Sequence, residues 1–281
     1  MRSLCVLALC SALSAAPVQG GSLEERPVQP VAYLESGPPA DYAPFVDSLS
    51  AYGRWFVYAG YGWVWTPTVV APDWRPYTVG RWVYTDAGWT WLTDEPWGWA
   101  TCHYGRWFYD GAYGWIWVPD TVWGPAWVCW RTGPAFYGWA PLPPGFVFGV
   151  TTARCNPWMG GWVFVSVDWF LSPNLHYHAV PPVRNVYVYD RTSPEVRTTV
   201  TRTPGETRSI VVPRGPDPAE VSARAAQPVP RYSLQSLRDR PSAPDFRELD
   251  GDRVRIARPE FPREMRPGRV KLSPGARRLE E

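Results

Sequence analysis

Three carboxylates recur in a repeated pattern and are the residues best suited to hydrolytic chemistry. Asp73, Glu95 and Asp120 each fall in a connection between aromatic segments. Glycoside hydrolysis needs two carboxyl groups ~5–10 Å apart across the scissile bond. Adjacent residues such as Asp94 and Glu95 more often form a solvated cap, and all three carboxylates could instead pair with arginines of neighbouring segments. We therefore prefer a structural role and predict no catalytic residue.

Two histidines give the strongest indication of a metal. His176 and His178 flank a single residue, so in a strand both rings would lie on one face, and imidazole is the commonest metal ligand. Asp168 and Cys155 are the only further ligand types nearby in the sequence. A structural or catalytic zinc needs three or four protein ligands. We therefore predict neither a metal site nor a cofactor.

The cysteines allow one disulfide. Cys102, Cys129 and Cys155 remain when the two cysteines of a predicted leader are set aside, and an odd number leaves at least one thiol. Cys102 with Cys129 is the predicted pair, because both lie in corresponding parts of adjacent repeats. Such a loop would stabilise the fold by ~3–4 kcal/mol in the chain-entropy model, and three buried thiols are the alternative. His103 would point away from Cys102 in a strand, which argues against a catalytic thiol–imidazole pair.

The first 20 residues have the pattern of a secretory signal peptide. Arg2 precedes an apolar stretch from Leu4 to Leu13, and small residues follow. That stretch is shorter than the ~20 residues that span a bilayer. Leu9 stands where a lipoprotein signal before Cys10 requires a small residue, so lipidation is not predicted. We expect a protein exported to the periplasm, the outer-membrane periphery or the medium, without a transmembrane segment.

The elements that position these residues form a repeat of about 26 residues. Gly-Arg-Trp and Gly-Trp-x-Trp alternate along the chain, the first at 53–55, 80–82 and 105–107, the second at 62–65, 88–91 and 114–117. An aromatic and β-branched run, a glycine turn and a return strand are typical of a hairpin. The fold class predicted is all-β, with antiparallel hairpin repeats of about 26 residues that form a meander or a closed or two-layer sheet.

All 19 Trp lie between Trp55 and Trp169. Because side chains two positions apart share a face of a strand, the repeat predicts four same-face pairs: Trp63 with Trp65, Trp89 with Trp91, Trp97 with Trp99, and Trp115 with Trp117. Stacked in register, these rings would form a ladder. The rings either fill the core, since aliphatic residues are scarce, or present a platform for sugars. Arg54, Arg81 and Arg106 each precede a Trp and face solvent or make cation–π contacts. These eight Trp and three Arg are the candidate ligand-binding residues.

The composition shifts along the chain. From Gly21 to Val183 seven Arg stand against twelve Asp and Glu, whereas residues 184–281 carry 20 basic and 14 acidic residues. The mixed charges of the second region argue against a polybasic nucleic-acid arm. We divide the chain into five parts: a signal peptide (1–20), a linker (21–44), a Trp-rich β-repeat domain (45–190), an extended, Arg/Pro-rich and largely irregular tail (191–258) and a disordered end (259–281).

Further elements are predicted beyond the repeat. Additional strands are expected at Phe146–Phe148, Trp162–Val167 and Asn185–Tyr189, and residues 191–207 are expected to form a flexible linker. The tail is predicted to hold short strands at Ser209–Val212, Arg231–Leu234 and Arg253–Ala257. Asp217 and Pro218 are typical of the N-cap and first position of a short helix near 217–226.

The segments GRWVYTDAGWTW, EPWGWA and YGRWFYDGAYGWIWVP resemble the exported, Trp-rich bacterial domain family of unknown function. The likeness covers roughly residues 45–190. Members of that family are sometimes joined to iron-dicitrate-sensor-like regulator domains, and the resemblance implies a Gram-negative-type envelope protein without implying an activity. Other residue types are usual at Cys102 and Cys129, so a disulfide there would be a local feature. The chain is more loosely similar to the aromatic–glycine hairpin repeats of cell-wall-binding proteins, in which successive hairpins form ligand cages.

The leading hypothesis is a non-enzymatic envelope protein, a binding or structural module that presents aromatic residues to a glycan, peptidoglycan or another cell-wall polymer, or a partner protein. No nucleic-acid partner is expected. One alternative is a scaffold whose Trp are all core and whose basic tail makes the contacts. Another is a wall hydrolase that depends on carboxylates such as Asp73, Glu95 and Asp120.

Overall fold

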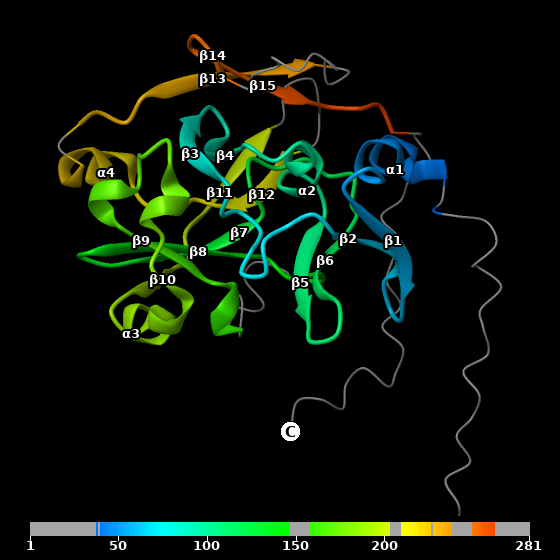
Figure 1. Cartoon of the computed structure of the whole chain (residues 1–281). Helices are drawn as coiled ribbons and strands as arrows, with labels where there is room; N and C mark the ends of the chain where they lie inside the picture. Colours follow the sequence, from blue (N-terminus) through cyan, green and yellow to red (C-terminus); the bar gives the residue numbers. More distant parts are fainter. Residues whose placement is uncertain are drawn as a thin grey trace, which may run out of the picture. The chain divides into compact units, whose positions relative to one another are not determined.

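The computed structural model shows a mostly β protein. It describes residues 38, 40–146, 158–202, 209–225, 227–237 and 249–261. Within these residues fifteen strands form antiparallel and mixed open sheets, joined by a few short helices (Figure 1). The all-β fold class is confirmed. The predicted signal peptide, Cys155, residues 147–148 of the predicted strand and the chain after residue 261 lie outside the described residues.

Three hairpins occupy the three repeat units: β1 (Gly53–Tyr58) with β2 (Gly62–Pro67), β3 (Gly80–Thr85) with β4 (Gly88–Thr93), and β5 (Arg106–Asp110) with β6 (Gly114–Val118). In each, the Trp of Gly-Arg-Trp lies opposite the second Trp of Gly-Trp-x-Trp: Trp55 with Trp65, Trp82 with Trp91, and Trp107 with Trp117. A fourth hairpin of β7 (Val128–Thr132) and β8 (Phe136–Pro141) places Trp130 opposite Trp139. Each such cross-strand pair contributes ~0.2–1 kcal/mol beyond Ala.

The glycine of each Gly-Arg-Trp motif is required by this packing. A Cβ on Gly53 would lie 2.2 Å from the Thr66 carbonyl oxygen and 2.5 Å from the Trp65 ring. At Gly80 and Gly105 the same atom would also lie 2.2 Å from a carbonyl oxygen of the return strand. The missing side chain lets the return-strand Trp lie across the start of the first strand. Gly-Arg-Trp and Gly-Trp-x-Trp therefore recur together because the glycine of the first motif leaves room for the second Trp of the other.

The hairpins do not stack in chain order. β2 pairs with β6 at Trp65 and Trp117, so the first and third hairpins form a sheet of order β1-β2-β6-β5. The second hairpin lies in a sheet of order β14-β15-β13-β3-β4, and the fourth in one of order β10-β7-β8-β9. A single ladder of consecutive hairpins is therefore wrong. The connections at 68–79 and 94–105 are long enough to carry the chain from one sheet to another.

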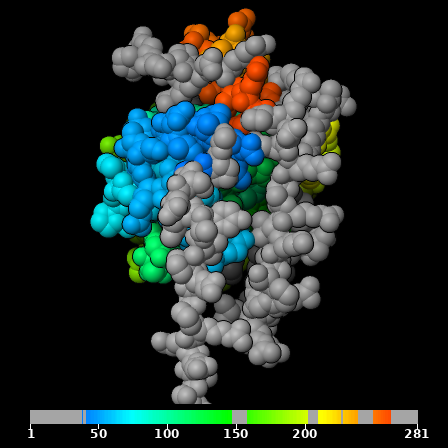
Figure 2. Space-filling model, turned by 90° about the vertical axis from the view of Figure 1, so that its right-hand side faces the viewer, coloured from blue at the N-terminus to red at the C-terminus, as the bar shows by residue number. Residues whose placement is uncertain are grey.

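Four of the described strands after residue 190 join the sheets of the hairpins, and two form a sheet of their own. The predicted flexible linker instead contains β10 (Ser193–Glu195), which pairs with β7, and β11 (Thr198–Arg202), which pairs with β12 (Ser209–Pro213). β13 (Arg231–Leu237) lies parallel to β3 and to β15 (Arg253–Ala257), with β14 (Leu249–Asp250) at the edge. From the orange strand β15 the chain runs on to the blue N-terminal helix at Ala43–Leu49 (Figures 1 and 2), where the Phe261 and Phe45 ring centroids are 5.1 Å apart. The strands expected at 209–212, 231–234 and 253–257 are therefore present.

Short helices account for the other local differences from expectation. α4 (Pro218–Arg224) begins as predicted after Asp217, but α1 (Ala43–Leu49), α2 (Gly98–Thr101) and α3 (Asn185–Tyr189) are unexpected. α2 lies in the EPWGWA motif, so Trp97 and Trp99 are not a strand pair, and α3 replaces a predicted strand. One or two helical turns are too short to show a 3.6-residue period. The remaining described elements are β9 (Val163–Ser166), at the strand expected around 162–167, and the 3-10 turns η2 (Ala40–Tyr42), η3 (Met159–Gly161), η4 (Val167–Trp169), η5 (Leu175–His178) and η6 (Pro182–Arg184).

Tryptophan fills the core in place of aliphatic residues. The largest fully buried side chains include Trp65, Trp91, Trp107, Trp117, Trp123 and Trp139. At ~25 cal/mol per Å², a Trp that buries ~150–250 Å² contributes roughly 4–6 kcal/mol. Several indole N–H groups donate to loop carbonyls, as Trp117 does to Tyr104 at 2.8 Å and Trp139 to Tyr77 at 2.9 Å. These rings therefore tie the sheets to their connections.

Candidate functional site

The tryptophans predicted to bind a ligand lie mostly in the core. Seven of the eight are at most 6% exposed: Trp65, Trp89, Trp91, Trp97, Trp99, Trp115 and Trp117. Trp63 is half-buried. A ligand cannot stack on rings with so little accessible surface. The paired indoles therefore serve mainly the packing of the sheets, and among them Trp115 also lines the cavity described below.

The three repeated arginines have different surroundings. Arg54 is exposed, with its guanidinium carbon 5.5 Å from the centroid of Phe56. The guanidinium of Arg106 lies 3.5 Å from the Trp127 ring, and burial lowers the pKa of Arg106 to about 10. Arg81 lies 4.0 Å from the Asp94 carboxylate in a partly exposed ion pair. Two of the three therefore make the cation–π contact that the sequence allows.

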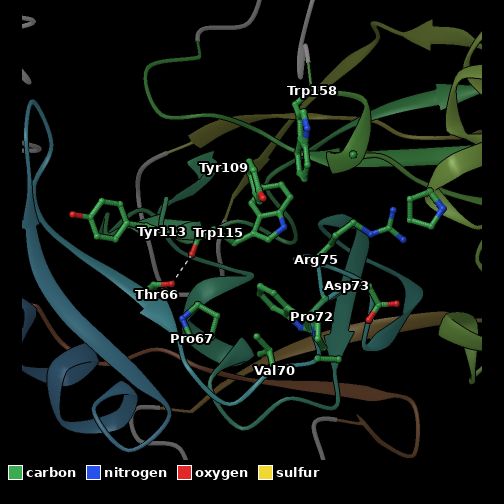
Figure 3. Close-up of a pocket in the computed structure, with 15 residues that line it drawn as sticks. Thr66, Pro67, Val70, Pro72, Asp73, Arg75, Tyr109, Tyr113, Trp115 and Trp158 are labelled. Carbon is green, nitrogen blue, oxygen red and sulfur yellow. Dashed lines mark hydrogen bonds between the residues drawn. The ribbon is translucent and has the colours of Figure 1, made fainter. Parts of the chain in front are cut away.

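A cavity of about 460 Å³ lies beside the third hairpin (Figure 3). One wall consists of rings that remain accessible, since Tyr109 is 44% and Trp158 38% exposed. These two rings stack with centroids 3.9 Å apart and planes 14° apart, and Trp158 meets Trp115 edge-on at 5.4 Å. Tyr109 and Trp115 are opposite residues of β5 and β6. The hairpin therefore sets the position of this aromatic wall.

Close backbone packing seats the Trp158 ring. A Cβ on Gly160 would lie 2.3 Å from that ring, so only glycine leaves room for it there. Arg75, which is buried, donates from Nη1 to the carbonyl of Trp162 at 2.8 Å. This bond joins the connection after β2 to the segment that carries Trp158. The walls of the cavity are therefore held together by contacts between regions far apart in the sequence.

The opposite wall comes from the end of β2 and the connection that follows it. Thr66 donates from its hydroxyl to the Trp115 carbonyl at 2.9 Å, and Pro67 and Val70 supply apolar surface (Figure 3). The exposed carboxylate of Asp73 lies on the same side as Arg75. Rings and apolar groups with a few polar side chains are the usual lining of a small-molecule site.

The three candidate carboxylates have separate roles. Asp73 lines the cavity, whereas Asp120 caps a turn by accepting from the backbone amides of the next two residues. Glu95 is buried and accepts a hydrogen bond from Trp74 Nε1, and Trp74 itself lines the cavity. Burial raises the pKa of Glu95 to about 8, against the opposing effect of that hydrogen bond. Glu95 is therefore largely protonated at neutral pH and positions Trp74 from behind the wall.

The predicted disulfide between Cys102 and Cys129 is wrong. Cys102 is a buried thiol at the end of α2. Cys129, by contrast, is disulfide-bonded, so the two cannot be joined to each other. Corresponding positions in adjacent repeats predict proximity only if both lie in like elements, whereas Cys102 ends a helix between the second and third hairpins and Cys129 lies on β7 of the fourth hairpin.

The histidines also lie in unexpected elements. His176 and His178 belong to the 3-10 turn η5, so the shared strand face does not exist. The His178 ring stacks on Trp169 at 3.8 Å. His103 is buried beside Trp123, its Nδ1 is 2.9 Å from the Gly124 carbonyl, and burial lowers the pKa of His103 to about 4. Within the described part of the chain, no three His, Cys, Asp or Glu side chains gather as metal ligands would.

Three exposed rings of the site are absent from the sequence-based candidates: Tyr109, Tyr113 and Trp158. Tyr109 and Tyr113 belong to the third repeat unit, and Trp158 lies outside the 26-residue period. The available signal is chemical, because a Tyr hydroxyl is best kept hydrated or hydrogen-bonded, whereas Trp is used here as core filler. The 26-residue period of the Trp pairs, taken alone, selects rings that are buried in the core.

These features define a tryptophan-cored β protein with open sheets and an accessible aromatic cavity. Residues 46–146 match the family model described as "Family of unknown function (DUF6600)". The match spans all four hairpins and every cavity-lining residue before Trp158. No curated protein and no solved structure matches the chain. None of the helices in the described ranges has the length and apolarity needed to cross a membrane.

Proposed function

We propose that this protein is an exported, non-enzymatic binding module of the cell envelope that takes a glycan in the cavity beside the third hairpin. The accessible stack of Tyr109 on Trp158 carries this proposal. Unlike most other aromatic residues of the chain, Tyr109 and Trp158 are accessible, and both line the cavity. Accessible aromatic surface that lines a cavity together with a few polar groups is typical of a ligand-binding site.

Glycan chemistry fits this lining. A sugar ring presents C–H groups on its faces, and these carry partial positive charge that the negative face of an aromatic ring attracts. The sugar hydroxyls at the ring edge need hydrogen-bond acceptors and donors. Asp73 supplies an exposed carboxylate at the cavity, and carboxylate oxygens accept hydrogen bonds from hydroxyl groups. The wall can therefore hold a sugar by its face and orient it by its edge.

The alternatives have less support. A scaffold with a separately acting basic tail would need residues 191–281 to be independent, yet β10 pairs with β7 and β13 with β3. A wall hydrolase would need two carboxyl groups across one bond. Of the three candidate carboxylates only Asp73 lines the cavity.

Titration with muramidase-released peptidoglycan fragments and with N-acetylglucosamine oligomers tests the proposal. Trp158→Ala should weaken binding about tenfold or more, because truncating a central aromatic anchor costs ~1.4–2 kcal/mol or more. Trp169→Ala is the matched control, since Trp169 is 50% exposed but does not line the cavity. Equal affinities of the two variants, or no binding of any glycan by the parent protein, would remove the proposal.

Export is tested separately. Expression of the full chain and N-terminal sequencing of the mature protein should show removal of about the first 20 residues, as secretory signals of this length predict. Retention of the intact leader in the cytoplasmic fraction would contradict an envelope location.

A further inference from the structure

The outer face of the first sheet carries a second set of rings. Phe56, Tyr58, Tyr61, Phe108 and Tyr113 form an outer aromatic cluster on β1, β5 and their turns. Tyr58 contacts Phe108 with centroids 5.3 Å apart, and Tyr61 contacts Phe108 at 5.1 Å. The cluster thus joins the two edge strands of the sheet across its centre.

Part of this cluster has a structural role. Val64 lies opposite Phe56 and Ile116 opposite Phe108 in the strand registers, so all four share the outer face. Val64 and Ile116, on the two central strands, are fully buried. The rings cover these aliphatic side chains but are themselves only half-buried. What the cluster presents to solvent is therefore ring surface and tyrosine hydroxyls without exposed aliphatic groups.

Tyr113 belongs both to this cluster and to the cavity. It lines the cavity and is 48% exposed, and its ring stacks on Phe56 with centroids 5.0 Å and planes 25° apart. In Figure 3 Tyr113 lies on the side of the cavity away from Trp158, with its hydroxyl directed away from Trp115. The aromatic surface therefore continues from Trp158 and Tyr109 around the β5–β6 turn onto the outer face.

Asp110 holds this turn in place. Its Oδ1 accepts from the amides of Ala112 and Tyr113 at 2.8 and 3.0 Å, and its Oδ2 accepts from the Tyr58 hydroxyl at 2.8 Å. The Tyr58 hydrogen bond, with those amides, lowers the pKa of Asp110, so the carboxylate stays ionised. One side chain thus fixes Tyr113 relative to the outer aromatic cluster. A surface fixed before binding loses less entropy when a ligand is bound.

We propose that the ligand is an extended glycan chain, which occupies the cavity with one part and continues over Tyr113 onto the outer aromatic cluster. This inference rests on the proposed function and adds that the ligand is polymeric. Successive sugars of a chain can each stack on a ring, as successive bases do on aromatic residues of single-strand binding proteins. Tyrosine hydroxyls and the absence of exposed aliphatic groups in the cluster favour a hydroxyl-rich polymer over a lipid surface.

The test compares oligomer lengths. Binding of N-acetylglucosamine oligomers of one to six units, and of muramidase-released glycan chains, is measured by calorimetry on the parent protein and on Tyr61→Ala and Trp158→Ala. Tyr61 is chosen because it lies in the outer aromatic cluster and does not line the cavity. Tyr187→Ala is the control, because Tyr187 is an accessible tyrosine of α3 that belongs neither to the outer aromatic cluster nor to the cavity lining. Thermal unfolding confirms that each variant is folded.

The expected results separate the two claims. The parent should bind long oligomers more tightly than short ones, Tyr61→Ala should lose about tenfold for long oligomers only, and Trp158→Ala should lose affinity for all lengths. The extended site is overturned if the parent binds short and long oligomers equally well, or if Tyr61→Ala binds long oligomers as tightly as the parent. Either result leaves the cavity as the only binding site proposed. Absence of binding at every length overturns the proposed function itself.

Discussion

Replacing Gly53 with Ala tests the packing that explains the repeat. Gly53 has an ordinary φ, so the added methyl group acts only through space. That methyl carbon would lie 2.2 Å from the Thr66 carbonyl oxygen and 2.5 Å from the buried Trp65 ring. The carbonyl belongs to the β1–β2 ladder and cannot turn aside, so the strands must separate. Overpacking costs ~1–3 kcal/mol, and we expect the upper half of that range. The midpoint of thermal unfolding should fall by roughly 4–12 °C for a chain of this size.

Gly111→Ala is the matched control. Gly111 lies in the turn after β5, has no other atom within 4 Å of the added methyl group and also has an ordinary φ. Its substitution should be neutral or stabilise by up to ~1 kcal/mol, because Ala restricts the unfolded chain. Urea unfolding followed by Trp fluorescence measures both variants. If Gly53→Ala proves as stable as Gly111→Ala, close approach is not the reason that glycine precedes Arg-Trp.

Two further predictions concern stability. Because burial raises the pKa of Glu95 to about 8 from 4.5, the folded protein keeps a proton that the unfolded chain releases, and stability should fall as pH rises from about 4.5 to about 8. This decline in the free energy of unfolding is at most ~1.4 kcal/mol per pH unit. Glu95→Gln keeps an acceptor for Trp74 and should abolish the decline, which urea unfolding at pH 5, 6.5 and 8.5 would measure. If the variant keeps the parent's dependence of stability on pH, Glu95 is not its source. The Asp217 side chain accepts from the Ala219 amide at 2.9 Å, so Asp217→Ala should cost ~1 kcal/mol, seen as a small drop in the unfolding midpoint that Asp217→Asn does not show.

The sequence predicts the hairpins because their signals are local. Alternation of period two, a glycine in each turn and the paired motifs all lie within one repeat unit. The order of the sheets depends on contacts that no period records. β13 joins β3 through Arg231 opposite Tyr84 and Tyr232 opposite Thr85, across more than half of the chain. A repeat therefore indicates what each unit is without indicating which unit lies beside it.

The candidate site is less predictable for a related reason. Paired Trp residues recur most regularly because every hairpin needs them in its core, so regularity selects structural residues. The accessible rings are Tyr109, Tyr113 and Trp158, and the last reaches the cavity only through the fold. Glu95 shows the same limit. Its position in EPWGWA is visible in the sequence, but its contact with Trp74 and its raised pKa depend on burial.

Differences between repeat units are the better guide to exposed surface. The residue two places after the arginine of Gly-Arg-Trp is Phe56 in the first hairpin, Val83 in the second and Phe108 in the third. Val83 and its neighbour on that face, Thr85, are buried, so small β-branched residues fit where another layer covers the sheet. Phe56 and Phe108 instead cover their own sheet and remain half-exposed. Large rings at this position therefore mark the hairpins whose second face is open, and these are the hairpins on which the proposed glycan surface lies.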